Sequence, residues 1–203
     1  MEIYIICNNL YENNLTFSDK LDIERKKMTR PLSVYGEEVA KNISLLECLN
    51  NSLVIYSSMF SSSLATAKYL AERLNKNIVV EEKLNDCKVG NLGNKNLKMV
   101  KFMQNHDFNI KLNNGESLEE VASRISDVIS KIIYLNKKAV VFTHRRTLLG
   151  FLIRHGKAAY NLEDDLVIEF NDKVIYDDTD KDVDIVKVTV ENKKIVDIDV
   201  IDF

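Results

Sequence analysis

The sequence predicts a three-layer α/β/α sandwich with a mostly parallel central sheet and antiparallel hairpins near the C-terminus. Short apolar runs alternate with amphipathic helical segments over residues 1–155, which is typical of a parallel sheet covered by helices on both faces. From residue 166 onward, paired apolar runs with short polar turns replace the helices. One proline and six glycines leave little material for a linker, so we expect a single domain over residues 1–203.

The strands are predicted from short runs that are rich in β-branched residues. Four such runs lie in the first part of the chain, and their near-continuous apolar character indicates strands that are buried on both faces. Two hairpins are expected later, around Asn171-Asp172 and around residues 191–193. The expected strands are Glu2–Ile6, Ser52–Ser57, Asn77–Val80, Ala139–Thr143, Leu166–Phe170, Lys173–Tyr176, Val183–Val190 and Lys194–Val200.

The helices are predicted from apolar residues that recur every three or four positions. One helix is expected from Ser33 onward and another after residues 61–63, whose serines are expected to cap it. A long helix should start at Ser117, since Ser117 and Glu120 have the spacing of a capping box. Residues 145–154 should form the last helix. The polar segments 8–30 and 81–115 are expected to be irregular.

The composition excludes several classes of function. A net charge of -3 and a pI near 5.7 argue against nucleic acid or an anionic membrane surface as the main partner. No apolar run reaches the roughly 18 residues that span a bilayer, and no secretory leader is evident. Cys7, Cys48 and Cys87 lack metal-type spacing. We therefore expect a cytoplasmic protein without a metal or cofactor, and edge strands in the hairpins allow a homodimer.

The candidate site follows from where the strands end. In sheets of this kind, ligands bind beyond the carboxyl ends of the parallel strands. The residues expected there are Cys7-Asn8, Ser57-Ser58 and Thr143-His144. The pattern alone therefore predicts that these three segments meet at one crevice.

Five short motifs follow one another along the first three quarters of the chain. They are Pro31-Leu32-Ser33-x-x-Gly36, Ile55-Tyr56-Ser57-Ser58, Leu84-Asn85-Asp86-x-x-x-Gly90, Gly115-Glu116-Ser117 and Val141-Phe142-Thr143-His144. In this order they resemble motifs of the histidine phosphatase (phosphoglycerate mutase-like) superfamily. The resemblance covers residues 1 to about 155, and the order of the motifs makes it more specific than any one of them. It implies the sandwich fold already predicted.

The resemblance also shows which chemical groups differ. In this family the first strand ends in Arg-His-Gly, and its histidine accepts the phosphoryl group. Carried over by position, that arginine and histidine become Cys7 and Asn8, the second arginine becomes Ser62, and the acid becomes Asp86. Of the five groups, only His144 is retained, and the glycine that usually follows it is Arg145.

These differences favour a catalytically degenerate member that acts by binding. An asparagine amide is not a nucleophile, and loss of two arginines weakens stabilisation of a phosphoryl group. The partner would be a small phosphorylated or polar ligand, held by Asn8, Ser62, His144 and Arg145, or another protein. The alternative is a phosphatase or phosphoglycerate mutase-type enzyme that works through substitute residues, with Cys7 as nucleophile and His144 as base.

Several other basic residues could belong to the site or could have only a structural role. Arg145 and Arg146 could restore positive charge to the crevice, or could only start a helix that faces solvent. The run with Lys26, Lys27 and Arg30 could meet an acidic ligand, or could be a solvated loop. Residues 154–156 spell Arg-His-Gly, but they end a helix rather than a strand, with Gly156 as the expected C′ glycine. We therefore assign them no catalytic role.

Overall fold

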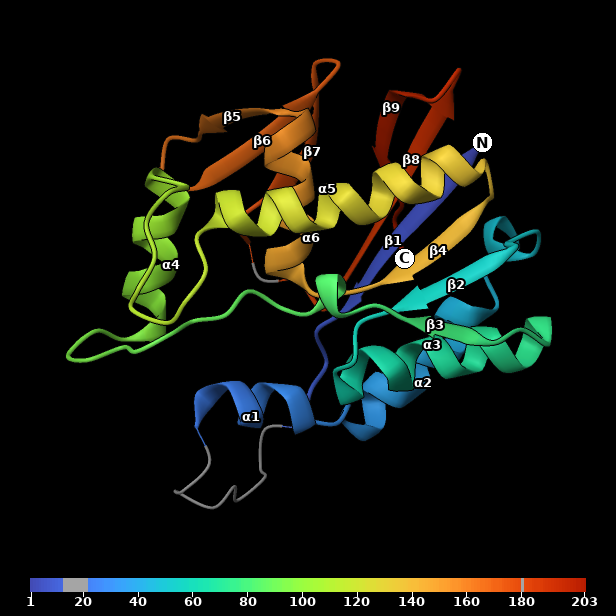
Figure 1. The fold of residues 1–203 in the computed structure, drawn as a ribbon, viewed down its shortest axis with the longest axis horizontal. Coiled ribbons are helices and arrows are strands. Elements are labelled where there is room, and N and C mark those ends of the chain that lie inside the picture. The colour runs from blue at the N-terminus through green and yellow to red at the C-terminus, as the bar shows by residue number, and fades with distance from the viewer. Residues whose placement is uncertain (13–21, 180) are drawn as a thin grey trace.

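The computed structural model describes residues 1–12, 22–179 and 181–203, and the fold is the sandwich that the sequence predicts (Figure 1). A six-stranded sheet has the order β3-β2-β4-β1-β8-β9. Its first four strands run parallel, β8 is antiparallel to its neighbour β1, and β9 is antiparallel to β8. Its strands are β1 (Glu2–Asn8), β2 (Val54–Ser57), β3 (Ile78–Val80), β4 (Ala139–Phe142), β8 (Val183–Glu191) and β9 (Lys194–Val200).

Helices cover both faces of this sheet because side chains alternate along its strands. In β1, Ile3, Ile5 and Cys7 face one core, whereas Tyr4 and Ile6 face the other. The first core is covered by α5 (Leu118–Leu135) and α6 (Arg145–His155), and the second by α2 (Val34–Ser44) and α3 (Ser61–Leu74). The predicted capping box is present at the start of α5.

A smaller antiparallel sheet lies beside α6 (Figure 1). It consists of β5 (Lys157–Tyr160), β6 (Leu166–Phe170) and β7 (Lys173–Asp177), in that order. The first predicted hairpin is therefore correct, and β5 adds a strand that the sequence analysis did not predict. The Lys173 ammonium pairs with Asp197 and Asp199 of β9, so this sheet also contacts the edge of the larger one.

The two segments expected to be irregular each contain a helix. Within residues 8–30, α1 (Ile23–Thr29) is capped by Asp22, whose carboxylate accepts a hydrogen bond from the backbone of Arg25 at 2.8 Å. Residues 13–21 of that segment lie outside the described residues. Within residues 81–115 lie α4 (Leu97–His106) and a short 3-10 turn over Glu82–Leu84.

Two local predictions at helix ends are wrong. The serines at 61–63 lie inside α3 and do not cap it, because the N-cap is Phe60 and makes no side-chain capping bond. Gly156 is the C-cap of α6 with a φ of -98°, so it is not a left-handed C′ residue. Glycine is required there for space, because a Cβ would lie 2.5 Å from Ile168 and 2.8 Å from the Glu169 carbonyl oxygen.

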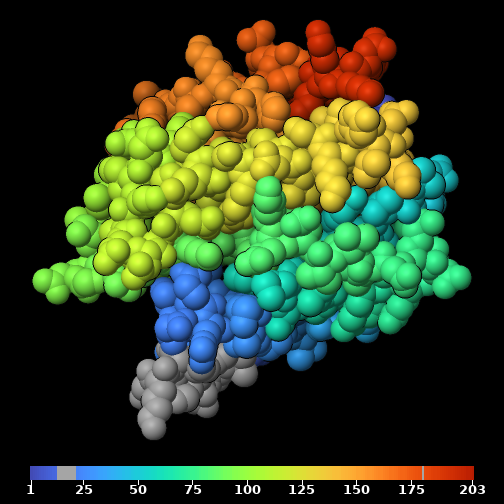
Figure 2. All heavy atoms as spheres, viewed as in Figure 1, coloured from blue at the N-terminus to red at the C-terminus, as the bar shows by residue number. Residues whose placement is uncertain are grey.

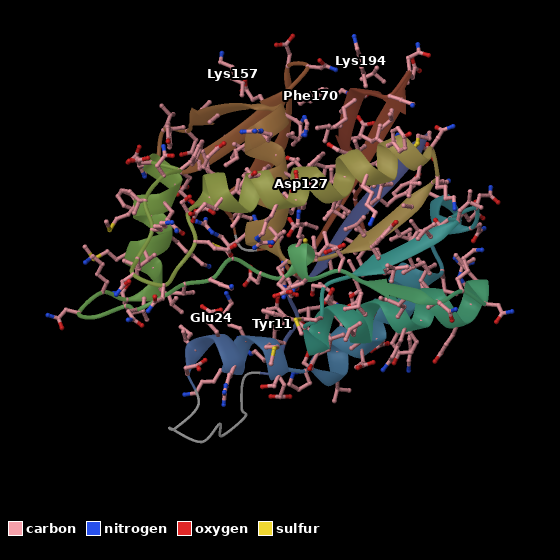
Figure 3. The ribbon with its side chains drawn as sticks, in the orientation of Figure 1. Tyr11, Glu24, Asp127, Lys157, Phe170 and Lys194 are labelled. Carbon is pink, nitrogen blue, oxygen red and sulfur yellow. The ribbon has the colours of Figure 1, made fainter. Side chains whose placement is uncertain are left out.

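Helix α1 lies on the side of the molecule opposite to the small sheet (Figure 1). In Figure 2 the atoms of α1 lie directly below the chain that leads from β3 towards α4. Figure 3 places Glu24 and Tyr11 together at this side, far from Lys157 and Lys194 at the opposite side. The Glu24 carboxylate accepts a hydrogen bond from the backbone of Val89 at 2.6 Å, which holds α1 in place. Among the described residues, no helix is long and apolar enough to cross a membrane.

Candidate functional site

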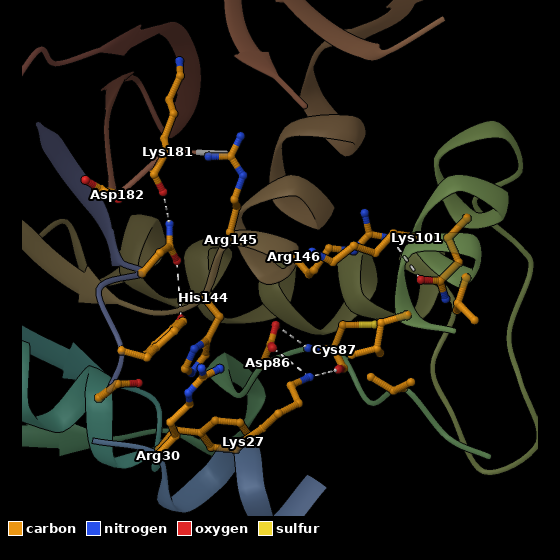
Figure 4. Close-up of a pocket in the computed structure, with 18 residues that line it drawn as sticks. Lys27, Arg30, Asp86, Cys87, Lys101, His144, Arg145, Arg146, Lys181 and Asp182 are labelled. Carbon is orange, nitrogen blue, oxygen red and sulfur yellow. Dashed lines mark hydrogen bonds and ion pairs between the residues drawn. The ribbon is translucent and has the colours of Figure 1, made fainter. Parts of the chain in front are cut away.

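A cavity of about 420 Å³ lies where the sequence predicts a crevice, beyond the carboxyl ends of β1, β2 and β4 (Figure 4). Its walls come from segments far apart in the sequence, including α1, the starts of α3 and α6, and one face of α4. The lining residues are Asn9, Tyr11, Lys27, Arg30, Phe60, Ser62, Asp86, Cys87, Val89, Leu97, Val100, Lys101, Gln104, His144, Arg145, Arg146, Lys181 and Asp182.

His144 ends the β4 segment and is the N-cap of α6. It is 4% exposed, its Nε2 is hydrogen-bonded to Ser58 Oγ at 2.8 Å, and its ring packs on Phe60 at 4.8 Å between centroids. Burial lowers the pKa of His144 to about 4, although the carboxylate of Asp86 opposes this shift. His144 is therefore a neutral imidazole at physiological pH, held at the wall of the cavity.

Asp86 is ion-paired with a lysine that the sequence analysis placed in a loop. Lys27 Nζ lies 2.7 Å from Asp86 Oδ2, and it also donates to the Cys87 carbonyl oxygen at 2.7 Å. Burial disfavours the charge on Asp86, but the ammonium of Lys27 and the nearby His144 outweigh it and lower the pKa of Asp86 to about 2. Asp86 is thus a fixed carboxylate, not a proton donor at neutral pH.

Two helices begin at the cavity without a side-chain cap. The N-cap of α3 is Phe60 and that of α6 is His144, and neither makes a capping hydrogen bond. The first backbone N–H groups of such helices favour anions, because they are unpaired and lie at the positive end of the helix dipole. Ser62 in the first turn of α3 is 3% exposed and lines the cavity, and its hydroxyl makes no hydrogen bond with any described residue. It is therefore a donor without a partner in the cavity wall.

Cys7 and Asn8 do not line the cavity. Cys7 is completely buried in the core under α5 and α6, and burial raises the pKa of its thiol well above the usual value. Asn8 is 6% exposed. Its amide donates to the Gly36 carbonyl oxygen at 3.0 Å and accepts from the backbone of Leu10 at 3.2 Å. Asn8 therefore joins the end of β1 to the start of α2, and its neighbour Asn9 lines the cavity instead.

Arg145 reaches the cavity but is paired within the protein. Its Nη1 lies 2.9 Å from Asp184 Oδ1, its Nη2 donates to the Asp177 carbonyl oxygen at 2.7 Å, and its guanidinium lies over the ring of Tyr176. Asp184 therefore neutralises much of the positive charge that Arg145 brings to the cavity.

Arg146 also lines the cavity and has a different environment. Its Nη1 donates to Asn105 Oδ1 at 2.6 Å, and its Nη2 donates to Gln104 Oε1 at 3.0 Å. Both acceptors are neutral amides on α4. The interpretation of Arg146 as a helix-start residue that only faces solvent is therefore wrong.

The cavity is cationic although the whole chain is acidic. Six lining side chains are basic, against two carboxylates. The basic residues are Lys27, Arg30, Lys101, Arg145, Arg146 and Lys181. Together with the two uncapped helices, they make the cavity suited to an anion.

Several residues of the cavity wall were not predicted from the sequence. Lys101, Gln104 and Lys181 were not singled out, because nothing in the local sequence indicates that α4 and the segment before β8 turn towards the strand ends. Lys27 and Arg30 were noted only as a basic run. The predicted residues that the structure brings together here are Ser62, Asp86, His144 and Arg145.

The Arg-His-Gly sequence at residues 154–156 ends α6, as predicted, and does not line the cavity. Arg154 pairs with Glu119 at the start of α5, and the His155 ring packs on Phe151. These contacts are structural, and none of the three residues lines the cavity.

Comparisons with solved structures find the same fold in bacterial phosphatases. A mycobacterial glucosyl-3-phosphoglycerate phosphatase superposes with a TM-score of 0.66 at 12% identity, covering 98% of this chain and 96% of that one. The alpha-ribazole phosphatase from Shigella flexneri superposes with a TM-score of 0.62 at 16% identity, covering 95% and 92%. At these identities the likeness concerns the fold. A search of curated protein sequences finds no significant match.

The sequence itself is matched by a family model. The model of the histidine phosphatase superfamily (branch 1) covers residues 25–151, from α1 through the strand that delivers His144 to the middle of α6. The match therefore spans most of the sandwich and much of the cavity wall. This chain belongs to the histidine phosphatase superfamily.

Proposed function

We propose that this protein is a catalytically degenerate member of the superfamily that binds a phosphorylated ligand without forming a phosphohistidine. The observation that carries this proposal is the environment of Asn8, which stands where the family has its nucleophile. Its amide is bonded to Gly36 and Leu10 and lies outside the cavity wall. An amide nitrogen with a delocalised lone pair cannot attack phosphorus, and here the nitrogen also donates its hydrogen bond to Gly36.

The cavity supplies binding groups in place of the lost arginines. The Ser62 hydroxyl, the uncapped first turns of α3 and α6 and several cations surround one space. A hydrogen bond to a charged group contributes roughly 1.5–3 kcal/mol. A few such bonds are enough to hold a phosphoryl group without reacting with it. This supports a binding role over a closed and vestigial pocket.

The alternative is an enzyme that works through Cys7, His144 and Arg145. The raised pKa and complete burial of Cys7 leave little thiolate and no path to a ligand. The pairing of Arg145 with Asp184 reduces the charge that it can offer to a transition state. These observations favour binding. His144 remains the group on which an active enzyme would have to depend.

One set of measurements distinguishes a binding protein from an enzyme with substitute residues. The purified protein is titrated with inorganic phosphate by calorimetry and assayed with an aryl phosphate over a range of pH. We expect saturable phosphate binding without turnover. Turnover that His144→Ala or Cys7→Ala abolishes would contradict the proposal that the protein is catalytically degenerate. Absence of phosphate binding would contradict the proposal that its ligand is phosphorylated.

A restored variant provides a second test. Cys7→Arg, Asn8→His and Ser62→Arg return the family residues. Arg145→Gly must accompany them, because Cys7 lies near Arg145 and two cations there would repel each other. We expect this fourfold variant to hydrolyse the aryl phosphate at a measurable rate. The matched control keeps Asn8 and changes the other three residues, and it should remain inactive. Equal activity in both would contradict the assignment of position 8.

A further inference from the structure

The cavity has a second group of cations at the end formed by α4. Arg145 and Arg146 are consecutive at the start of α6, and neighbouring helical residues point about 100° apart. Figure 4 shows Arg145 extending towards Lys181 and Asp182, whereas Arg146 extends towards α4 and Lys101. The positive charge is therefore spread over two places and not concentrated at the strand ends alone.

The Arg146 guanidinium is held in a fixed orientation. Gln104 and Asn105, which accept its two hydrogen bonds, are only 4% and 3% exposed. Gln104 Nε2 donates to the carbonyl oxygens of Ile110 and Glu116 at 3.1 and 2.8 Å. Asn105 Nδ2 donates to Asp178 Oδ2 at 2.8 Å. These anchors fix both amide oxygens towards Arg146, so the guanidinium is oriented before any ligand binds.

Arg146 differs from three other cations of the cavity in that no carboxylate of the described residues balances its charge. Lys27 is paired with Asp86, Arg145 with Asp184, and Lys181 with Asp177. Among the described residues, Arg146 makes no ion pair, since its acceptors are amides and Asp178 lies behind Asn105.

Lys101 is the second cation in this position. It lines the cavity from α4, and it makes no hydrogen bond or ion pair with any described residue. An oriented guanidinium and an ammonium, both without a carboxylate partner, thus face the same space. Such an arrangement is typical of a site that an anion completes.

We propose that Arg146 and Lys101 form a second anion-binding subsite, so that the ligand carries two anionic groups joined by an apolar spacer. The first group would occupy the uncapped helix starts near Ser62, as under the proposed function on which this inference rests. Val89, Leu97 and Val100 give the cavity an apolar wall that suits a hydrocarbon spacer. The structure thereby narrows the ligand class from phosphorylated compounds to compounds with two separated anionic groups.

The test compares two series of probes by calorimetry. Alkylphosphonates carry one anionic group, and α,ω-alkane bisphosphonates of the same chain length carry two. We expect one bisphosphonate length to bind at least about tenfold more tightly than its matched alkylphosphonate, the effect of one added charge-assisted hydrogen bond. A bisphosphonate series that binds no better than the alkylphosphonates at any length would overturn the second subsite.

Variants assign the effect to the proposed residues. Arg146→Gln and Lys101→Gln should each weaken bisphosphonate binding by a larger factor than alkylphosphonate binding, and so reduce the bisphosphonate advantage. Lys98→Gln is the matched control, since it removes the same charge from α4 at a position that does not line the cavity. Arg146→Lys keeps the charge in case loss of Arg146 destabilises α4, and it should retain part of the advantage.

The outcomes also separate this inference from the proposed function. Loss of all phosphonate binding in the wild type would contradict both. Alkylphosphonate binding without a bisphosphonate advantage would leave the proposed function standing and overturn the second subsite. Equal weakening of both series by Arg146→Gln would show that Arg146 belongs to the first site, which also overturns it.

Discussion

His144 connects the chemistry of the cavity to the pH dependence of stability. Its pKa is about 4 in the folded protein, against 6.5 for an unperturbed imidazole. The unfolded chain therefore binds a proton between these values that native His144 does not, so stability falls as the pH drops through this window. The full difference in pKa corresponds to a loss of unfolding free energy on the order of 3 kcal/mol.

A substitution at His144 should remove this dependence. We expect the free energy of unfolding of His144→Gln, measured with urea, to change less than that of the wild type between about pH 6.5 and pH 4. His106→Gln is the control. The pKa of His106 is raised by its hydrogen bond to the Phe102 carbonyl, so its contribution to stability is lost as pH rises. The acid-induced loss should therefore persist in that variant.

The ion pair between Lys27 and Asp86 also acts at the scale of single residues. Both side chains are largely buried, with 24% and 17% exposed. Lys27→Met would leave the carboxylate of Asp86 buried without its ammonium, so we expect a loss of roughly 2–4 kcal/mol in unfolding free energy at pH 7. Lys26→Met removes the same charge from the preceding residue of α1 and should lower the unfolding free energy by less than about 0.5 kcal/mol. Similar losses in both variants would mean that the pair contributes little.

At the scale of elements, the sequence predicts best where burial sets the pattern. The strands of the large sheet and the long helix α5 bury regular apolar faces, so periodicity reveals them. α1 buries none of its residues completely, and it is held instead by Asp22 and by the bond from Val89 to Glu24. In α4 most large apolar side chains are exposed, and the buried positions include Gln104 and Asn105. α1 and α4 therefore lie at the surface and contribute little to the core, and tertiary contacts fix their places.

The same reason explains how much of the site was predictable. The strand ends are set by the regular sheet, so the crevice and His144 could be located from the sequence. The orientation of Asn8 could not, because it depends on a carbonyl group 28 residues away. The roles of Lys27 and Arg146 depend on α1 and α4, which tertiary contacts place beside the crevice.

The capping box of α5 gives a prediction for an element. The Ser117 hydroxyl accepts from the backbone of Glu120 at 3.2 Å, and the Glu120 carboxylate accepts from the backbone of Ser117 at 3.0 Å. Ser117→Ala should lower the free energy of unfolding by about 1 kcal/mol, measured by urea denaturation. Ser123→Ala, an exposed position inside the same helix, should be neutral or slightly stabilising because alanine favours helices. A neutral Ser117→Ala would contradict the importance of this cap.

At the scale of the whole molecule, charge is distributed unevenly. The chain has a net charge of -3, yet the cavity is lined by six cations and two carboxylates. We expect inorganic phosphate at ten times its dissociation constant to stabilise the protein by about 1.4 kcal/mol, visible as a rise in Tm. Added sodium chloride should reduce this shift by screening. Chloride at equal ionic strength serves as the control, and an equal rise with chloride alone would contradict a phosphate site.

The contact between Arg145 and Asp184 also constrains how such a chain can evolve. Asp184 lies in β8 beside the end of β1, and it is 9% exposed. A mutation of Arg145 to glycine alone would leave the carboxylate of Asp184 without its ion-pair partner in the protein interior. A mutation of Cys7 to arginine alone would place a second cation beside Arg145. Each single step towards the family's catalytic residues is therefore harmful until the other has occurred. The ion pair therefore couples positions 7 and 145, so that exchanging both residues together should cost less stability than exchanging either one alone.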